Sequence, residues 1–279
     1  MGAEILAVKR LRKSFGAVRA CQDLSFTVQR GVIHALIGPN GAGKTTVANL
    51  LSGELRPDGG HIIFAGADIT TLKTYQRARI GLARSFQITQ VFEELSVAEN
   101  MALAILANEG GNFRFWHDAL CSPVVLERLP LALERVDLVA QQKMAAKHLS
   151  HGERRQLEVG MALAGRPTLL ILDEPMAGQG PGGTRELSRI IKDLKNEVSI
   201  LLVEHDMQVV FSLADHITVL VNGACIADGP PEPSGRTRRA GCLFGETMTM
   251  LAVSTIDGYY GDSQVLFGID LCIGEGEVV

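Results

Sequence analysis

The stretch GPNGAGKTT at residues 38–46 decides the fold of this 279-residue chain. It satisfies the pattern G-x-x-x-x-G-K-[ST] through Gly38, Gly43, Lys44 and Thr45. A continuous apolar run, GVIHALI (31–37), precedes it, and VANLLSG follows it at helical spacing. Glycine lets the backbone curl so that successive N–H groups point at phosphate oxygens, and a helix start adds partial positive charge. The pattern predicts a phosphate-binding loop between a buried strand and a helix.

The residues of this loop have expected tasks. The Lys44 ammonium is expected to reach the β and γ phosphates, and the Thr45 hydroxyl to bind Mg²⁺. Nucleotide contacts are expected along the whole loop, from Gly38, Pro39, Asn40, Gly41, Ala42, Gly43, Lys44, Thr45 and Thr46. The alternative is an ordinary glycine-rich turn, which the strand before it and the helix after it disfavour.

A second motif, TLLILDEP (168–175), supplies the other half of a nucleotide site. Its apolar residues predict a buried strand, and Asp173 follows at the carboxyl end, where open α/β sheets bind ligands. Asp173 is expected to hold Mg²⁺ through water, and Glu174 to orient or deprotonate the attacking water. Two acids at a strand end usually mean a solvated end, but a phosphate loop in the same chain favours the catalytic interpretation.

His205 comes just after another buried strand, in SILLVEHD (199–206). Alone it would be interpreted as structural, but a strand parallel to that of Asp173 makes a contact with the γ-phosphate plausible. No histidine stands in an H-E-x-x-H motif or another metal-ligand spacing, so a metalloenzyme has no support. The guanine-binding pattern N-K-x-D is absent as well.

Composition excludes two further classes. A formal net charge of −4 and a pI near 6.0 disfavour a nucleic-acid-binding surface. The longest apolar runs, such as MALAILA (101–107), are far shorter than the roughly 20 residues of a membrane span. If the protein acts at a membrane, it is therefore expected to bind at the membrane surface without crossing it. Five scattered cysteines predict reduced thiols, most simply small buried hydrophobes.

Strand-like and helical segments alternate along most of the chain. This order predicts an α/β fold, a phosphate-loop NTPase core with a mostly parallel sheet. Residues 5–8 and 24–28 predict an antiparallel β part near the N-terminus, with SFGAVRA (14–20) connecting its strands. A helical subdomain is expected to be inserted at about residues 88–160.

The order of GPNGAGKTT, SFQ (85–87), LSHGERRQLEVGMAL (149–163), LLILDEP and LLVEHD resembles the ATP-binding subunits of ABC transporters. The resemblance implies two ATPases that face each other with ATP between them. The signature Ser150, His151, Gly152 and Glu153 would act on the partner's ATP, with Ser150 as N-cap of its helix. Gln87 would link Mg²⁺ to the helical subdomain. Phe15 would stack on adenine, the alternative being a core phenylalanine.

Within this family, the segments FQITQVFEELSVAENMALA and DEPMAGQGP most resemble the ATPases of branched-chain amino-acid importers. This implies an ATPase that uses ATP and Mg²⁺, pairs with a second ABC ATPase subunit and binds integral membrane permeases. It would lie peripherally on the cytoplasmic face of the inner membrane and serve a solute-binding protein indirectly. His151 and Glu153 depart from the usual signature, and Gly180 stands where many members have aspartate. A urea importer, a soluble two-ATPase ribosome-associated protein and an inactive ATP-binding switch are the alternatives.

Residues 251–278 repeat residues 6–33 at an offset of 245. Leu6, Ala7, Val8, Gly16 and Gly31 recur as Leu251, Ala252, Val253, Gly261 and Gly276, and Tyr260 stands at the position of Phe15. The repeat predicts an ABC ATPase domain over 1–245 and the truncated start of a second over 246–279, from a fusion or a read-through. Chance similarity of strands is the alternative. Prolines and arginines in 230–245 predict an irregular segment.

Overall fold

The computed structural model describes residues 3–85, 91–108, 119–231, 249–260 and 263–274, the last two ranges as backbone. The chain divides into two compact units, Met1–Pro231 and Glu232–Val279, and each is described by itself. Most of the segment expected to be irregular, from residue 232 on, lies outside the described residues.

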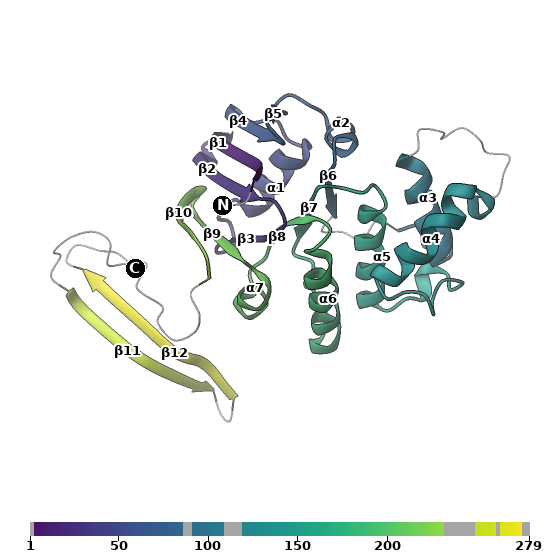
Figure 1. The fold of residues 1–279 in the computed structure, drawn as a ribbon. Helices are drawn as coiled ribbons and strands as arrows, with labels where there is room; N and C mark the ends of the chain where they lie inside the picture. Colours follow the sequence, from purple (N-terminus) through teal and green to yellow (C-terminus); the bar gives the residue numbers. More distant parts are fainter. Residues whose placement is uncertain (1–2, 86–90, 109–118, 232–248, 261–262, 275–279) are drawn as a thin grey trace. The chain divides into compact units, whose positions relative to one another are not determined.

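A six-stranded sheet of order β10-β9-β3-β8-β7-β6 forms the centre of the first unit (Figure 1). Its strands are β3 (Ile33–Ile37), β6 (Leu82–Ser85), β7 (Leu169–Asp173), β8 (Ser199–Val203), β9 (His216–Val221) and β10 (Ala224–Gly229). All neighbours are parallel except β9 and β10. Every residue of β3, β7 and β8 is buried, as expected for strands covered on both faces. The predicted mostly parallel sheet is confirmed.

A four-stranded antiparallel sheet of order β2-β1-β4-β5 contains the N-terminal residues. Its strands are β1 (Glu4–Phe15), β2 (Val18–Gln29), β4 (Gly59–Phe64) and β5 (Ala67–Asp68), and helix α2 (Thr74–Arg79) follows them. The prediction that residues 14–20 connect two short strands is wrong, because Phe15 already pairs with Val18. The turn is confined to two residues, and Gly16 adopts the left-handed φ of 57° that so tight a reversal needs.

Helices cover both faces of the parallel sheet. Alternate residues of a strand point to opposite faces, and Leu169 and Ile171 of β7 share a core with the antiparallel sheet and α1 (Lys44–Ser52). Leu170 and Leu172 belong to the core of the other face. Helices α5 (His151–Leu163), α6 (Pro181–Leu194) and α7 (Met207–Leu213) contribute to that second core. The site described below therefore stands on a strand layer held from both sides.

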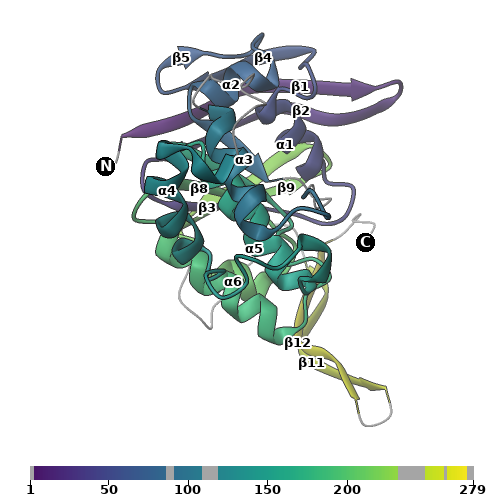
Figure 2. The same ribbon diagram turned by 90° about the vertical axis from the view of Figure 1, so that its right-hand side faces the viewer.

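Helices make up much of the described part of the region expected to be a helical subdomain, and turns connect them. It contains α3 (Val97–Asn108), the 3-10 turn η1 (Ala119–Cys121), α4 (Pro123–Arg135), the 3-10 turn η2 (Ala146–His148) and α5. Helix α3 packs on α4 and on α5, and the three helices stand together in Figure 2. Gly160 of α5 lies against this contact: a Cβ there would be 2.5 Å from the terminal methyl of Met101 and 3.1 Å from Val136.

One buried arginine ties the antiparallel layer to the end of α1. Arg77 of α2 is 1% exposed, and its guanidinium donates to the carbonyls of Leu50 and Leu51 at 2.7 Å each. It also donates to the carbonyls of Leu72 and Thr70. The last carbonyls of a helix have no partner within the helix, so Arg77 supplies donors to the end of the helix that starts at Lys44.

Two further expectations from composition can be checked. None of the helices in the described ranges has the length and hydrophobicity that a membrane crossing requires. Cys21 is buried as expected, but Cys121 is exposed and Cys225 is partly exposed, so the prediction of small buried hydrophobes is wrong for Cys121. Cys121 lies in a 3-10 turn between helices, where no strand or helix face directs it inward.

The second unit contains one hairpin, β11 (Thr249–Tyr260) with β12 (Ser263–Gly274). Its backbone repeats the β1–β2 hairpin. Adding 245 to each residue of the β1–β2 register gives the β11–β12 register, from Glu4 with Gln29, matched by Thr249 with Gly274, to the last pair before the turn. The register shifts fall at the same places.

Candidate functional site

The loop of residues 38–43 connects β3 to α1, as its sequence predicts. Gly38 and Gly43 have φ values of 157° and 99°, and a Cβ on either would lie within 2.3 Å of a backbone oxygen, of Leu220 or of Ala20. Only glycine fits such positions. Helix α1 begins at Lys44, so its first N–H groups have no partner within the helix and face the loop. The loop therefore has the backbone that an anion cradle needs.

Lys44 is 5% exposed, and its ammonium folds back over the loop. Nζ donates to the carbonyl of Gly38 at 2.7 Å and to that of Pro39 at 3.1 Å. A buried ammonium needs acceptors, and these carbonyls supply them. Thr45 is the next residue of α1 and is exposed, so its hydroxyl is open to a ligand. The loop thus holds one cation and one free hydroxyl where a phosphate chain is expected.

Asp173 ends β7 and is completely buried. Arg84 of β6 donates to its Oδ2 at 2.8 Å, whereas Oδ1 is buried with no hydrogen-bond partner among the described residues. Burial raises the pKa of the Asp173 carboxyl above its usual value, although the Arg84 guanidinium acts in the opposite direction. A buried acceptor without a partner is costly, so Oδ1 is suited to a group that arrives with the ligand, such as metal-bound water.

Glu174 follows with a left-handed φ of 47°, which is uncommon for a residue with a side chain. Its carboxylate lies beside His205, with Oε1 at 3.7 Å from His205 Nδ1. His205 comes after β8, the strand that stands between β3 and β7, and is 55% exposed. The carboxyl ends of these parallel strands therefore bring the loop, Asp173, Glu174 and His205 to one edge of the sheet.

Besides Arg84, sequence reasoning missed two further buried charged residues at this edge. Glu204 is 1% exposed and accepts from the N–H groups of Met176 and His205, and burial raises the pKa of its carboxyl. Arg155 of α5 donates to the backbone carbonyls of Asp173 and Glu174 at 3.1 Å each. Glu204 directly precedes His205, and Arg155 follows the signature residues, so each lies beside a residue to which the motif assigns a role.

Ser150 forms the predicted N-cap of α5. Its hydroxyl accepts from the N–H of Glu153, and the Glu153 carboxylate accepts from the N–H of Ser150, which completes a capping box. Ser150 and His151 are exposed, and Gly152 is partly buried. Gly178, after the Asp-Glu pair, lies close enough that a Cβ would meet the His151 ring at 3.5 Å. Gly180, the departure from the usual aspartate, is the N-cap of α6.

Phe15 is 47% exposed, with the Lys13 ammonium 5.6 Å from its ring centre. The alternative of a core phenylalanine is therefore wrong, and the ring face is accessible to a planar ligand. Gln87, which is expected at the metal, lies outside the described residues.

A separate polar cluster lies at the other end of β3. His34, His216 of β9 and Asp228 of β10 offer ligand atoms within 4.8 Å of one another. The Thr218 hydroxyl donates to Asp228 Oδ1 and is 2.7 Å from His34 Nε2. Burial, together with His216, lowers the pKa of His34 to about 4. Pairing of three strands assembles this group, so no spacing within the sequence indicates it.

Comparison with known proteins shows the family of this chain. A sequence profile of the family described as ABC transporter matches residues 21–177. The chain belongs to the ABC transporter family. It is an ABC ATPase, and the predicted α/β fold, a phosphate-loop NTPase core with a mostly parallel sheet, is confirmed. It is similar to a nucleotide-free ATP-binding cassette from an ABC transporter, with a TM-score of 0.73, 31% identity and coverage of 82% of this chain and 92% of that one.

A structure of the ADP conformation of the cassette MJ1267 gives a TM-score of 0.74 at 30% identity, covering 81% of this chain and 91% of that one. Among curated relatives, the branched-chain amino acid transport ATP-binding protein LivG of Salmonella typhimurium is 36% identical over 241 residues, 83% of this chain and 94% of LivG. BraF of Pseudomonas aeruginosa is 37% identical over the same shares.

Proposed function

We propose that this ABC ATPase binds and hydrolyses ATP to energise an importer for branched-chain amino acids. The observation that carries the substrate class is the similarity to LivG and BraF, which this chain matches over 94% of their length. The span that matches the ABC transporter profile, residues 21–177, contains the phosphate loop, the signature and the Asp173–Glu174 pair, which supports the ATPase mechanism proposed here.

The residue roles follow from the geometry at the sheet edge. Lys44 exchanges the carbonyls of Gly38 and Pro39 for the β and γ phosphates, since charged oxygens are the stronger acceptors. Glu174 orients and deprotonates the attacking water, and His205, within 3.7 Å of it, contacts the γ-phosphate. Phe15 stacks on adenine. The main-chain N–H groups of the loop complete the cradle.

The residues also fit Mg²⁺, which is held by oxygen ligands and keeps several of its waters. Thr45 offers an exposed hydroxyl, and the unpartnered Asp173 Oδ1 accepts from a metal-bound water. When bound, the ion would neutralise charge on the phosphates. Gln87 is proposed as a further ligand.

Ser150, His151, Gly152 and Glu153 act on the ATP of a second ABC ATPase subunit. The capping box leaves the Ser150 hydroxyl at an exposed helix start, and such a start favours an anion. We propose a dimer in which each signature closes on the partner's nucleotide. The dimer binds integral membrane permeases at the cytoplasmic face of the membrane.

The test is ATP hydrolysis by the chain in complex with its membrane subunits and solute-binding protein. We expect leucine to stimulate hydrolysis severalfold and urea to leave it unchanged. Stimulation by urea alone would move the substrate to urea while keeping the ATPase. Failure of the purified chain to bind MgATP would overturn the proposed mechanism as well.

We also propose that the first ABC ATPase domain covers residues 1–245 and that residues 246–279 open a second one. The identical register of the two hairpins supports this. In the first unit, β1 pairs with β4 as well as with β2. Among the described residues, β11 pairs with β12 alone, so one edge of β11 has no neighbouring strand there. Deleting 246–279 should therefore leave the melting temperature and ATP affinity of the first domain unchanged and reduce self-association. A melting point lower by many degrees would mean that the segment is a packed part of the first domain.

A further inference from the structure

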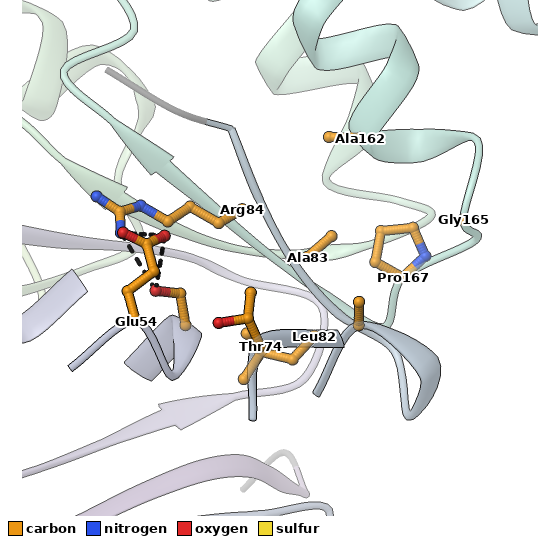
Figure 3. Close-up of a pocket in the computed structure, with 10 residues that line it drawn as sticks. Glu54, Thr74, Leu82, Ala83, Arg84, Ala162, Gly165 and Pro167 are labelled. Carbon is orange, nitrogen blue, oxygen red and sulfur yellow. Dashed lines mark hydrogen bonds and ion pairs between the residues drawn. The ribbon is translucent and has the colours of Figure 1, made fainter. Parts of the chain in front are cut away.

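Arg84 of β6 connects the acidic end of β7 to the helix that carries the phosphate loop. Its side chain is 6% exposed. One terminal nitrogen donates to Asp173 Oδ2 at 2.8 Å. The other donates to Asn49 Oδ1 at 2.6 Å, to Ser52 Oγ at 3.2 Å and to Glu54 Oε1 at 3.1 Å. Figure 3 shows the guanidinium reaching Glu54. Both residues line a pocket of about 200 Å³.

The partners named above lie on two elements of the fold, the second half of α1 with the residues after it and the carboxyl end of β7. Asn49 and Ser52 lie on α1, the helix that begins with Lys44 and Thr45. Asp173 lies on β7, to which β6 is paired with Arg84 opposite Ile171. The planar fork of an arginine can satisfy acceptors on both sides at once, which the single charge of a lysine cannot.

The contact also decides which carboxylate oxygen is left for a ligand. Oδ2 of Asp173 is bonded to Arg84, while Oδ1 is buried and has no hydrogen-bond partner among the described residues. Rotation of the carboxylate would break a charge-assisted hydrogen bond between buried groups, which is costly. Arg84 therefore fixes the carboxylate plane and leaves one oxygen available.

We propose that Arg84 is a positioning residue for the metal of the ATP site: it holds Asp173 by Oδ2 and presents Oδ1 to a water of nucleotide-bound Mg²⁺. It thereby links that carboxylate to the helix of the phosphate loop. The proposal rests on the proposed ATPase function and adds a residue that none of the recognised motifs contains.

The test compares Arg84→Gln and Arg84→Lys in the full chain, with Arg79→Gln as matched control because Arg79 is exposed on α2. ATP hydrolysis is titrated with Mg²⁺, and ATP affinity is measured separately in EDTA. Loss of an outer contact to a metal ligand costs about 10–100-fold in metal affinity or activity. We expect Arg84→Gln to raise the half-saturating Mg²⁺ about tenfold or more with metal-free ATP affinity unchanged. Arg84→Lys should give a smaller rise, and the control should give none.

A Mg²⁺ titration of Arg84→Gln that matches wild type overturns the positioning role, and so does a loss of metal-free ATP affinity equal to the loss of activity. If Arg84→Gln does not fold, Arg84→Lys decides, because it keeps the buried charge. A shift below twofold there overturns the proposal. Wild type that hydrolyses no ATP at any Mg²⁺ would instead refute the proposed function, so the two failures are distinguishable.

Discussion

Replacement of His34 by glutamine should reduce the loss of stability that this protein suffers between pH 7.5 and 5. His34 is 1% exposed in β3, and its ring faces His216 with centroids 4.8 Å apart. Burial, reinforced by His216, lowers its pKa from 6.5 to about 4, while Asp228 acts in the opposite direction. Glutamine stays neutral at every pH and keeps an amide that can reach the Thr218 hydroxyl.

The sign follows from linkage. A histidine whose pKa is lower in the folded state binds its proton first in the unfolded chain, so acid favours unfolding. The contribution of neutral, buried His34 to the free energy of unfolding is complete above pH 6.5 and is lost as the pH falls towards 4. The fall in pKa from 6.5 to about 4 corresponds to about 3 kcal/mol of unfolding free energy, of which about 2 kcal/mol is lost by pH 5.

Urea unfolding followed by circular dichroism at pH 7.5, 6 and 5 measures this difference. Glutamine can lower stability at all pH values, so the slope with pH is the readout. We expect wild type to lose about 2 kcal/mol more than His34→Gln between pH 7.5 and 5. His148→Gln, the same change at an exposed position, should keep the wild-type slope. Parallel curves for wild type and His34→Gln would refute the reasoning, because His34 would then hold its proton equally in both states.

Three further predictions concern the ATP site and its support. Glu174→Gln should keep ATP binding and slow hydrolysis by about 10²–10⁴, because a positioned base is lost; a rate within threefold of wild type in a phosphate-release assay would remove Glu174 from that role. Lys44→Ala should weaken ATP binding itself, and unchanged affinity by calorimetry would contradict the assigned phosphate loop. Arg77→Leu should lower stability in urea by several kcal/mol, because each carbonyl left without its buried donor costs about 1–3 kcal/mol; a loss below about 1 kcal/mol would mean that water replaces the donor.

What the sequence predicted well depends on short-range patterns. The strands β3, β7 and β8 are buried on both faces, so nearly every residue in them is apolar and the run itself indicates the strand. The Ser150 cap is equally local, because its two hydrogen bonds close within three residues. The phosphate loop is a third such case, since its glycines are needed by the loop's own backbone.

What the sequence did not predict depends on pairing between distant segments. In the sequence, Arg84 is a polar residue before SFQ that no motif marks. Its hydrogen bonds to Asp173 and Asn49 form because β6 pairs with β7 beside α1. The His34 cluster needs three strands side by side. Phe15 could be a core or a surface residue on its sequence, and only the edge position of the hairpin turn leaves it exposed.

The repeat is an intermediate case, and the backbone explains why few identities suffice to reveal it. Residues with positive φ recur along the β1–β2 hairpin and its flanking turns, at Arg10, Gly16, Asp23 and Gly31, with φ values of 46°, 57°, 48° and 68°. At an offset of 245 the sequence has Thr255, Gly261, Gly268 and Gly276, so three of these four positions carry a glycine. Glycine adopts such angles without strain. The side chains between these positions are free to change as long as the bends remain, so the two hairpins can share one register with little identity.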